Sequence, residues 1–161
     1  MNNKVFNLNF FLVSLSIFII DFSSKFFLLY SFNLESKGRL YVTPFMDFIM
    51  VYNPGISYGI FGGGGEIQRW ILVVLSGLII SYLIYWIKNS NSQLVSFSLC
   101  LIIGGALGNV IDRILYGKVI DFISLHVFDY YWYVFNIADI AIVFGGLFIL
   151  IYSLKDSYRN S

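Results

Sequence analysis

Charged residues are scarce in this chain of 161 residues. Lysine, arginine, aspartate and glutamate make up 12% of the sequence, against 58% hydrophobic residues, and the mean hydropathy is +0.80. A soluble globular domain carries roughly 25% charged residues, so this composition excludes that class and indicates an integral membrane protein. The formal net charge of +1 also excludes nucleic-acid binding through a large excess of basic residues.

Cysteine and histidine are almost absent. Cys100 is the single cysteine and lies inside an apolar run, which excludes a disulfide framework or a thiolate cluster and predicts a small buried residue. His126 is the single histidine and the sequence has no HExxH, so a zinc peptidase is disfavoured and His126 is expected to be an interfacial aromatic residue. We therefore expect neither a metal nor a cofactor.

Long apolar runs, by contrast, are abundant. Four of them reach the roughly 20 residues that a helix needs to cross the hydrocarbon core. They cover approximately residues 6–29, 67–87, 94–115 and 136–154. We predict a single domain over residues 1–161, an all-α membrane protein of four transmembrane helices with both termini on one side. Gly104 and Gly108 form a small-xxx-small pair in the third run and favour close helix packing.

The basic residues give only a weak signal of orientation. Lys4, Lys88, Lys155 and Arg159 lie on the terminal side of the predicted bundle, whereas Lys37, Arg39 and Lys118 lie on the opposite side. Because cytoplasmic loops carry an excess of lysine and arginine, this distribution leans toward cytoplasmic termini.

The two longer loops differ in character. The first, approximately residues 31–66, has β-branched and aromatic residues around an Asn-Pro-Gly turn that begins at Asn53, and a glycine run follows. We expect a small extramembrane β-sheet there, hinged at Gly62–Gly65. The second loop, residues 116–134, is dense in aromatic residues and is expected to be an irregular segment at the membrane interface.

Polar side chains gather on the side of these two loops. Each group lies at or near the end of a predicted span, and five separate segments contribute. The groups are Asp21 with Lys25, then Asn53, then Asn109 with Asp112 and Arg113, then Asp121, then Asn136 with Asp139. Because ionisable groups at membrane depth are costly and generally face a bundle interior or a wet cavity, we expect them to converge on a common cleft.

Two of these groups have an ordinary structural explanation. Asp21 and Lys25 are four residues apart, which is the spacing of a helical ion pair. Asp112 and Arg113 are placed to anchor the end of a helix. For both pairs the structural and the functional interpretations are equally open.

Asp121 and Asp139 are different, because neither has a basic residue at a compensating helical spacing. The helix dipole explains a carboxylate at the start of a helix, as for Asp139, but leaves Asp121 unexplained. Two carboxylates in a partly dry site share a proton, so that one acts as a base and the other as an acid. Such a pair activates a water for attack on a peptide carbonyl, which is aspartic-protease chemistry. A serine mechanism is disfavoured, since Ser24 and Lys25 point to different faces of a helix.

Five motifs carry a family resemblance. They are DFSSK (21–25), NPGISYG (53–59), GNVIDR (108–113), VIDF (119–122) and FNIAD (135–139). In this order, and at these spacings between four spans, the chain resembles the lipoprotein signal peptidases, the bacterial signal peptidases of type II, over essentially its whole length. The resemblance implies that Asp121 and Asp139 are the catalytic pair. It also implies that the site is shaped, and the substrate held, by Asp21, Lys25, Asn53, Gly55, Asn109, Asp112, Arg113 and Asn136.

The resemblance further implies a location and a substrate. It implies a protein of the bacterial inner membrane with cytoplasmic termini, an active site near the outer face and an outward-facing sheet that cradles the substrate. Family members cleave the signal peptide from a prolipoprotein just before a cysteine that carries diacylglycerol. The expected partners are therefore this substrate and membrane lipid, without nucleic acid, and the chain is expected to be a monomer.

Two other functions stay open from the sequence. Intramembrane aspartates also mark proton relays and ion paths, so a small transporter or ion-conducting bundle is one alternative. Against it, the charged residues lie at one face of the membrane instead of at successive depths across the bilayer. The other alternative is a noncatalytic membrane scaffold in which the aspartates only cap helices.

Overall fold

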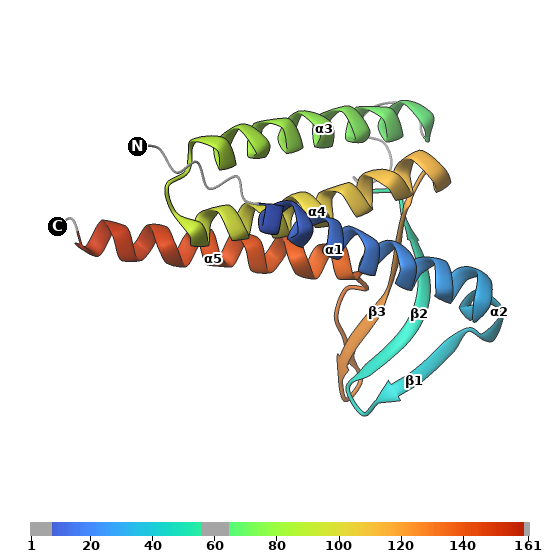
Figure 1. Ribbon diagram of the computed structural model, residues 1–161. Coiled ribbons are helices and arrows are strands. Elements are labelled where there is room, and N and C mark those ends of the chain that lie inside the picture. The colour runs from blue at the N-terminus through green and yellow to red at the C-terminus, as the bar shows by residue number, and fades with distance from the viewer. Residues whose placement is uncertain (1–7, 56–64, 160–161) are drawn as a thin grey trace.

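The fold is a bundle of four long helices with a small sheet at one end (Figure 1). The computed structural model describes residues 8–55 and 65–159. In chain order the elements are α1 (Leu8–Phe26), a π-helical turn η1 (Phe27–Ser31), α2 (Leu34–Lys37), β1 (Arg39–Thr43), β2 (Met46–Asn53), α3 (Glu66–Asn89), α4 (Gln93–Tyr116), β3 (Val119–Val127), β4 (Tyr130–Tyr131) and α5 (Ile137–Arg159). Helices α1 and α4 run toward the sheet, whereas α3 and α5 run away from it.

The four predicted spans are confirmed. Helices long and apolar enough to cross a membrane cover Phe10–Ser31, Glu66–Asn89, Gln93–Tyr116 and Ile137–Tyr158. Residues 6 and 7 of the first predicted span lie outside the described residues. The fourth helix continues beyond the predicted end at 154, because hydropathy marks where the chain leaves the apolar core and not where helical hydrogen bonding ends.

The predicted extramembrane sheet is confirmed, and it is larger than the first loop alone provides. It is antiparallel with strand order β1-β2-β3-β4. The expectation of an irregular second loop is wrong, because β3 pairs with β2 from Met46 opposite Leu125 to Asn53 opposite Val119. The first six residues of β3 are all buried. A strand buried on both faces does not show the alternation of apolar and polar residues by which a half-buried strand is recognised in a sequence.

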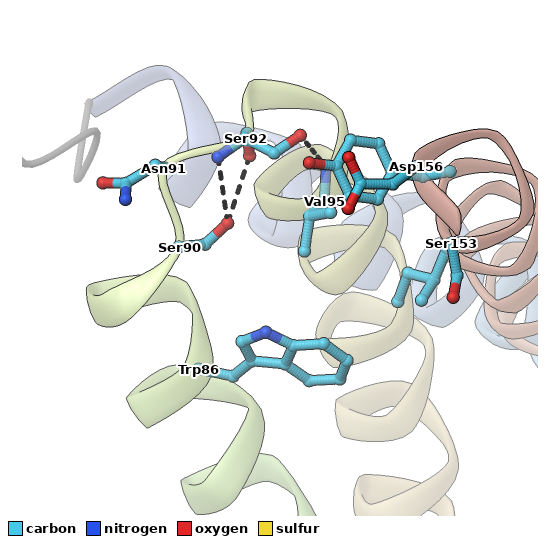
Figure 2. Close-up of a pocket in the computed structure, with 9 residues that line it drawn as sticks. Trp86, Ser90, Asn91, Ser92, Val95, Ser153 and Asp156 are labelled. Atoms are coloured by element: carbon cyan, nitrogen blue, oxygen red, sulfur yellow. Dashed lines mark hydrogen bonds between the residues drawn. The ribbon is translucent and has the colours of Figure 1, made fainter. Parts of the chain in front are cut away.

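The turns at the two ends of α4 are set by local residues. Ser92 caps the helix, since its Oγ accepts the N–H of Val95 at 3.4 Å, and Ser90 Oγ accepts the N–H of Ser92 at 3.2 Å (Figure 2). At the other end Gly117 adopts the left-handed conformation at φ +75°, which glycine reaches without steric cost. The chain therefore reverses at once into β3. Of the predicted glycine hinge, residues 62–64 lie outside the described residues.

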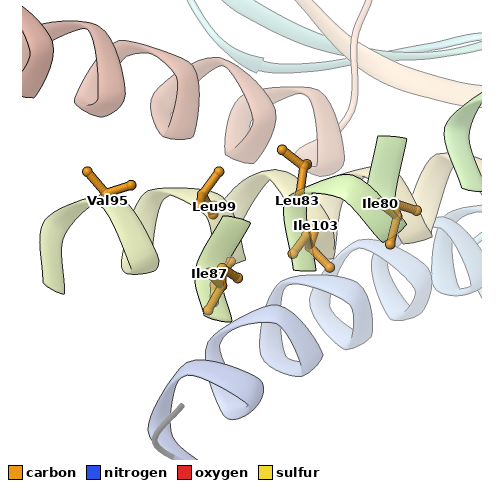
Figure 3. Packing of buried hydrophobic residues seen from close by; sticks show 7 residues of the cluster. Ile80, Leu83, Ile87, Val95, Leu99 and Ile103 are labelled. Atoms are coloured by element: carbon orange, nitrogen blue, oxygen red, sulfur yellow. The ribbon is translucent and has the colours of Figure 1, made fainter. Parts of the chain in front are cut away.

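Helix α4 is the centre of the bundle. One face of α3 packs against one face of α4, with apolar residues three and four positions apart on each helix (Figure 3). The residues are Ile80, Leu83 and Ile87 of α3 and Val95, Leu99, Cys100 and Ile103 of α4. Cys100 is 3% exposed, as predicted. The outer faces stay apolar, as with Leu78 and Val143, and are suited to contact lipid.

Glycines let the neighbouring helices approach α4 closely, as predicted from their spacing. A Cβ on Gly104 would lie 2.6 Å from the carbonyl oxygen of Ser14 in α1, and one on Gly105 would collide with the carbonyl oxygen of Ala138 in α5. Gly108 leaves room for the carboxylate of Asp21. These contacts fix α1 and α5 against the part of α4 that carries the polar residues.

Candidate active site

Asp121 is held inside the junction between the sheet and the bundle. It lies in β3 opposite Val51 of β2 and is 1% exposed. Its Oδ1 accepts a hydrogen bond from Nδ2 of Asn136 at 2.6 Å, and its Oδ2 accepts one from Nδ2 of Asn53 at 2.9 Å. Both carboxylate oxygens are thus oriented by amide donors from two different segments.

Asp139 lies in the first turn of α5 and is half-buried. Its Oδ1 accepts a hydrogen bond from Nδ2 of Asn109 at 2.9 Å, and its Oδ2 accepts the backbone N–H of Asn136 at 3.2 Å. In return Oδ1 of Asn136 accepts the N–H of Asp139 at 2.9 Å, a reciprocal pair of the capping-box kind. Asp139 therefore does cap its helix, and it is also bonded to the central helix α4.

Asn136 connects the two aspartates. Its side chain donates to Asp121 while its backbone donates to Asp139. Its Nδ2 also lies 3.2 Å from Oδ1 of Asn109 and 3.3 Å from the carbonyl oxygen of Ile120. Asn136 is completely buried. Its hydrogen bonds therefore fix the carboxylates of Asp121 and Asp139 relative to the Asn136 residue.

Asn53 is oriented by its own turn. Its Oδ1 accepts the N–H of Gly55 at 2.8 Å, so its Nδ2 is left to donate to Asp121. Gly55 has φ +92°, and a Cβ there would lie 2.8 Å from Cδ1 of Leu72 and 3.7 Å from a guanidinium nitrogen of Arg113. The turn thus packs between α3 and α4 beside the two aspartates. The remainder of the NPGISYG motif, residues 56–59, lies outside the described residues.

Asp21, Lys25 and Asp112 form a buried ionic triad. Lys25 Nζ lies 2.7 Å from Oδ2 of Asp21 and 2.7 Å from Oδ2 of Asp112, and all three side chains are at most 2% exposed. The second carboxylate oxygen of Asp21 accepts the N–H of Ala138, and Oδ2 of Asp112 accepts the N–H of Ile120.

The triad therefore joins α1 and α4 to the strand that carries Asp121 and to the helix that carries Asp139. For Asp21 with Lys25, the structural interpretation holds, because the two residues form an ion pair. The pair also contacts the backbone next to Asp139, so a role in positioning the site remains a proposal. Arg113, by contrast, donates through Nη1 to the carbonyl oxygen of Asn109 in its own helix at 3.1 Å. Among the described residues its buried Nε has no hydrogen-bond partner.

Burial sets the acid–base character of Asp121. Removal from water raises the pKa of this carboxyl to about 6, and the nearby charge of Asp139 acts in the same direction. The hydrogen bonds from Asn53 and Asn136 oppose this rise, because they stabilise the ionised form. Asp121 thus titrates close to neutral pH, in the range where a carboxyl group can both give and take a proton.

An apolar cavity of about 310 Å³ adjoins Asp139. Asp139 is its one charged lining residue within the described parts of the chain, and the walls come from the segment after β4 and from the outer face of α5. They include Trp132, Tyr133, Phe135, Val143 and Phe144. These wall residues lie outside the set predicted for the site, although the density of aromatic residues in the second loop was a signal for them.

A further buried carboxylate, Asp47 of β2, lies outside the set of residues predicted for the site. Its Oδ2 lies 2.8 Å from Nη1 of Arg39, and its Oδ1 lies 3.3 Å from Nε2 of His126, whose ring packs on Tyr131 at a centroid distance of 5.0 Å. This cluster lies within the sheet and has one residue from each of the strands β1, β2, β3 and β4. Within residues 8–55 and 65–159, no group of three or more His, Cys, Asp or Glu side chains could hold a metal ion.

Comparisons with known proteins identify relatives of this chain. The family model described as "Signal peptidase (SPase) II" matches residues 13–155. The lipoprotein signal peptidase of Rhodopseudomonas palustris (strain TIE-1) is 45% identical over 139 residues, covering 84% of this chain and 85% of the relative. That of Methylorubrum extorquens (strain PA1) is 42% identical over 140 residues, covering 87% of this chain and 82% of the relative.

A solved structure has the same fold. It is described as a bacterial membrane enzyme determined by the in meso method at 2.3 Å resolution, and it superposes with a TM-score of 0.85 at 28% identity over 100% of this chain and 96% of that one. The resemblance noted in the five motifs, the four-span membrane fold and the enzyme class are thereby confirmed. The chain belongs to the signal peptidase II family of aspartic peptidases.

Proposed function

We propose that this peptidase removes signal peptides from prolipoproteins by cleaving just before the diacylglyceryl-modified cysteine, with Asp121 and Asp139 as its catalytic pair. The observation that carries the proposal is the bridge through Asn136, which donates its side-chain N–H to one carboxylate and its backbone N–H to the other. The relatives named lipoprotein signal peptidase support the choice of substrate.

The pair acts as base and acid in turn. With one proton between them, the ionised aspartate takes a proton from a water molecule while that water attacks the carbonyl carbon before the cysteine. The protonated aspartate donates its proton to the carbonyl oxygen. Collapse of the tetrahedral intermediate breaks the C–N bond, and a proton passes to the leaving amine. We assign this proton to the pair and not to either residue, as is usual for two interacting carboxylates.

The remaining site residues position this pair. The triad of Asp21, Lys25 and Asp112 holds the backbone N–H groups of Ile120 and Ala138, each one residue from a catalytic aspartate. Asn53 and Asn109 orient one carboxylate each. Gly55 and Arg113 lie on the turn side of the site, where we propose that they contact the extended substrate.

The surroundings of Asp139 fit a lipid-bearing substrate. The apolar cavity beside this residue suits a hydrocarbon chain, and its aromatic walls are of the kind that lies at the level of lipid headgroups. We propose that the chain is a single-domain monomer of the bacterial inner membrane with cytoplasmic termini. The catalytic pair then lies near the outer face, where the cysteine bearing diacylglycerol is held by the bilayer itself.

A transporter fits the charge distribution less well. Helix α4 carries no charged side chain from Gln93 until Asp112, and α5 carries none between Asp139 and Lys155. An ion path through the bilayer needs polar groups at successive depths, whereas here they collect at one end.

The direct test is cleavage of a diacylglyceryl-modified prolipoprotein by Asp121→Asn and Asp139→Asn at matched expression, read as a gel shift. Either change should lower the rate by about 10²–10⁴-fold, the usual contribution of acid–base catalysis. Asp129→Asn, in the exposed turn between β3 and β4, is the matched control and should cleave normally. Thermal unfolding in detergent checks that each variant is folded. Normal cleavage by a folded Asp121 or Asp139 variant would remove that residue from the mechanism.

A further inference from the structure

The sheet contains a buried carboxylate that the proposed reaction does not use. Asp47 of β2 is completely buried, and each of its oxygens has its own partner. Nη1 of Arg39 in β1 lies 2.8 Å from Oδ2, and Nε2 of His126 in β3 lies 3.3 Å from Oδ1. A buried ion pair is often no more stabilising than apolar residues of the same volume. Stability alone therefore does not explain a charge at this position.

Both partners of Asp47 contact the same tyrosine of the short strand β4. The rings of His126 and Tyr131 have centroids 5.0 Å apart, and the guanidinium carbon of Arg39 lies 4.7 Å from the centroid of the Tyr131 ring. His126 is also the residue directly opposite Tyr131 in the sheet. Because β4 has only two residues, its ladder with β3 is short, and these side-chain contacts help to hold it. One carboxylate thus orients the two groups that contact Tyr131.

Tyr131 leads directly into the aromatic wall of the cavity beside Asp139. Trp132 and Tyr133 belong to that wall, and they are 63% and 87% exposed. Packing within the protein therefore holds little of their surface. The backbone N–H of Trp132 donates to the carbonyl oxygen of Leu125 in β3 at 2.8 Å. The position of the wall hence depends on how β4, the strand just before it, is held against β3.

We propose that Asp47 is a positioning residue for lipid recognition, which acts through Arg39, His126 and Tyr131 to hold the wall at Trp132 where an acyl chain of the substrate binds. The inference rests on the proposed function, in which the cavity of about 310 Å³ receives a hydrocarbon chain. An apolar side chain in place of Asp47 could fill the same space, but its contacts have no direction and would not orient the two partners. Loss of Asp47 should therefore weaken lipid binding and leave the chemical step unchanged.

The first measurement is kcat and KM for a diacylglyceryl-modified prolipoprotein in detergent micelles. Asp47→Leu should raise KM by about four- to fifteenfold, which is the effect of losing the burial of one or two methylene groups. Its kcat should stay within about twofold of the wild type, since only binding is lost. Asp47→Asn keeps an acceptor for Arg39 and should raise KM by a smaller factor, about two- to fourfold. Asp129→Leu, which removes an exposed carboxylate from the β3–β4 turn, is the matched control and should keep the wild-type KM.

The second measurement uses the two cleavage products as competitive inhibitors. One is a short peptide that begins with the diacylglyceryl-modified cysteine, and the other is the released signal peptide. Asp47→Leu should raise the inhibition constant of the lipidated peptide by the same factor as KM and leave that of the signal peptide unchanged. A merely structural role would weaken the two inhibitors alike or not at all.

A double variant tests the route through the tyrosine. Tyr131→Leu should raise KM by a factor similar to that of Asp47→Leu. The combination of both changes should be no worse than either change alone, because residues that act through one another are not additive. Thermal unfolding in detergent checks that each variant is folded.

An unchanged KM in folded Asp47→Leu would overturn the inference, and so would a loss confined to kcat. Equal weakening of both product inhibitors, or additive effects in the double variant, would overturn it as well. If Asp47→Leu does not fold, a wild-type KM in Asp47→Asn overturns it instead. Failure of the wild type to cleave the lipidated prolipoprotein would contradict the proposed function itself, so the two failures are distinguishable.

Discussion

At the scale of single residues, the site depends on the two-sided chemistry of asparagine. Asn136 must donate to Asp121 through Nδ2 and accept from Asp139 through Oδ1 at the same time. Only a side-chain amide offers both groups at this length. An aspartate at this position would place a third carboxylate beside two others, and a leucine would remove the donor to Oδ1 of Asp121 and the acceptor of the Asp139 N–H. Each aspartate is thus oriented by neutral donors that do not neutralise it.

The donor from Asn53 makes a testable difference to pH dependence. This hydrogen bond stabilises the ionised Asp121 and opposes the rise of its pKa to about 6, so Asn53→Ala should raise that pKa further. Activity needs one proton in the pair and ends as pH rises through the higher pKa. The alkaline limb of kcat/KM should therefore move to higher pH in Asn53→Ala, as measured between pH 5 and 9.

The matched control for this change is Asn89→Ala, which removes an amide from the exposed end of α3. Asn89→Ala should leave the alkaline limb of the kcat/KM profile at the same pH as in the wild type. A shift to lower pH in Asn53→Ala, or no shift, would contradict the assigned role of Asn53.

At the scale of elements, the ionic triad joins helices that the apolar core alone does not align. Lys25 of α1 contacts Asp112 of α4, and the backbone groups bound by the two carboxylates belong to β3 and α5. The triad therefore sets the relative depth of the two elements that carry Asp121 and Asp139. An apolar contact could supply similar stability, but its lack of direction would allow sliding.

Removal of the cation alone should be costly. Lys25→Met leaves two buried carboxylates without their partner, and breaking a buried ion pair in this way costs about 3–5 kcal/mol. The combination of Asp21→Asn, Lys25→Met and Asp112→Asn should recover most of this loss, because asparagine oxygens still accept the N–H groups of Ile120 and Ala138. Thermal unfolding in detergent measures both, with the exposed Lys118→Met as the control. A triple variant no more stable than Lys25→Met would contradict this account.

The close approach of α1 and α4 gives a separate prediction. Gly104→Ala would place a Cβ 2.6 Å from the carbonyl oxygen of Ser14 and 2.9 Å from Cβ of Ile17, and overpacking of this kind costs about 1–3 kcal/mol. Gly77→Ala in α3 meets no atom within 4 Å and should be neutral or gain up to about 1 kcal/mol from helix propensity. Equal unfolding temperatures for the two variants would show that α1 can shift without cost.

At the scale of the whole molecule, the polar groups of the proposed site collect at one end of the helical bundle. The sheet lies at one end of the bundle and the α3–α4 turn lies at the other (Figure 1). The triad and the proposed catalytic pair lie at the sheet end. The proposed orientation puts the sheet end at the outer face of the membrane and the α3–α4 turn at the cytoplasmic face, so a bond cleaved at the proposed catalytic pair would lie near the outer face.

This orientation can be measured with single cysteines. In a Cys100→Ala background, Asp129→Cys in the β3–β4 turn and Asn91→Cys in the α3–α4 turn place one exposed thiol at each end. A membrane-impermeant maleimide should label Asp129→Cys in spheroplasts and Asn91→Cys only after permeabilisation. Labelling of Asn91→Cys in intact spheroplasts would reverse the proposed topology.

Several features of this protein were determined by its sequence alone. Four apolar runs of sufficient length specify four spans, because hydropathy and helical rise are local properties. The gathering of Asp21, Asn109 and Asp139 on one side follows from their places at span ends, and that of Asp121 from its place in the loop between two spans. The motifs around these residues identified the family, and the spacing of Gly104 and Gly108 correctly predicted close packing.

The tertiary structure alone determined which strands pair and which side chains form ion pairs and hydrogen bonds. The sequence could not show that β3 completes the sheet, since its buried first half lacks strand alternation and its partner β2 lies about 70 residues earlier in the chain. Nor could it show that Lys25 pairs with Asp112 as well as with Asp21, that Asn136 joins the two aspartates, or that Arg113 bonds within its own helix. Hydrogen bonds and ion pairs depend on distances of a few tenths of an ångström between side chains from different elements, and only the packed bundle fixes those distances.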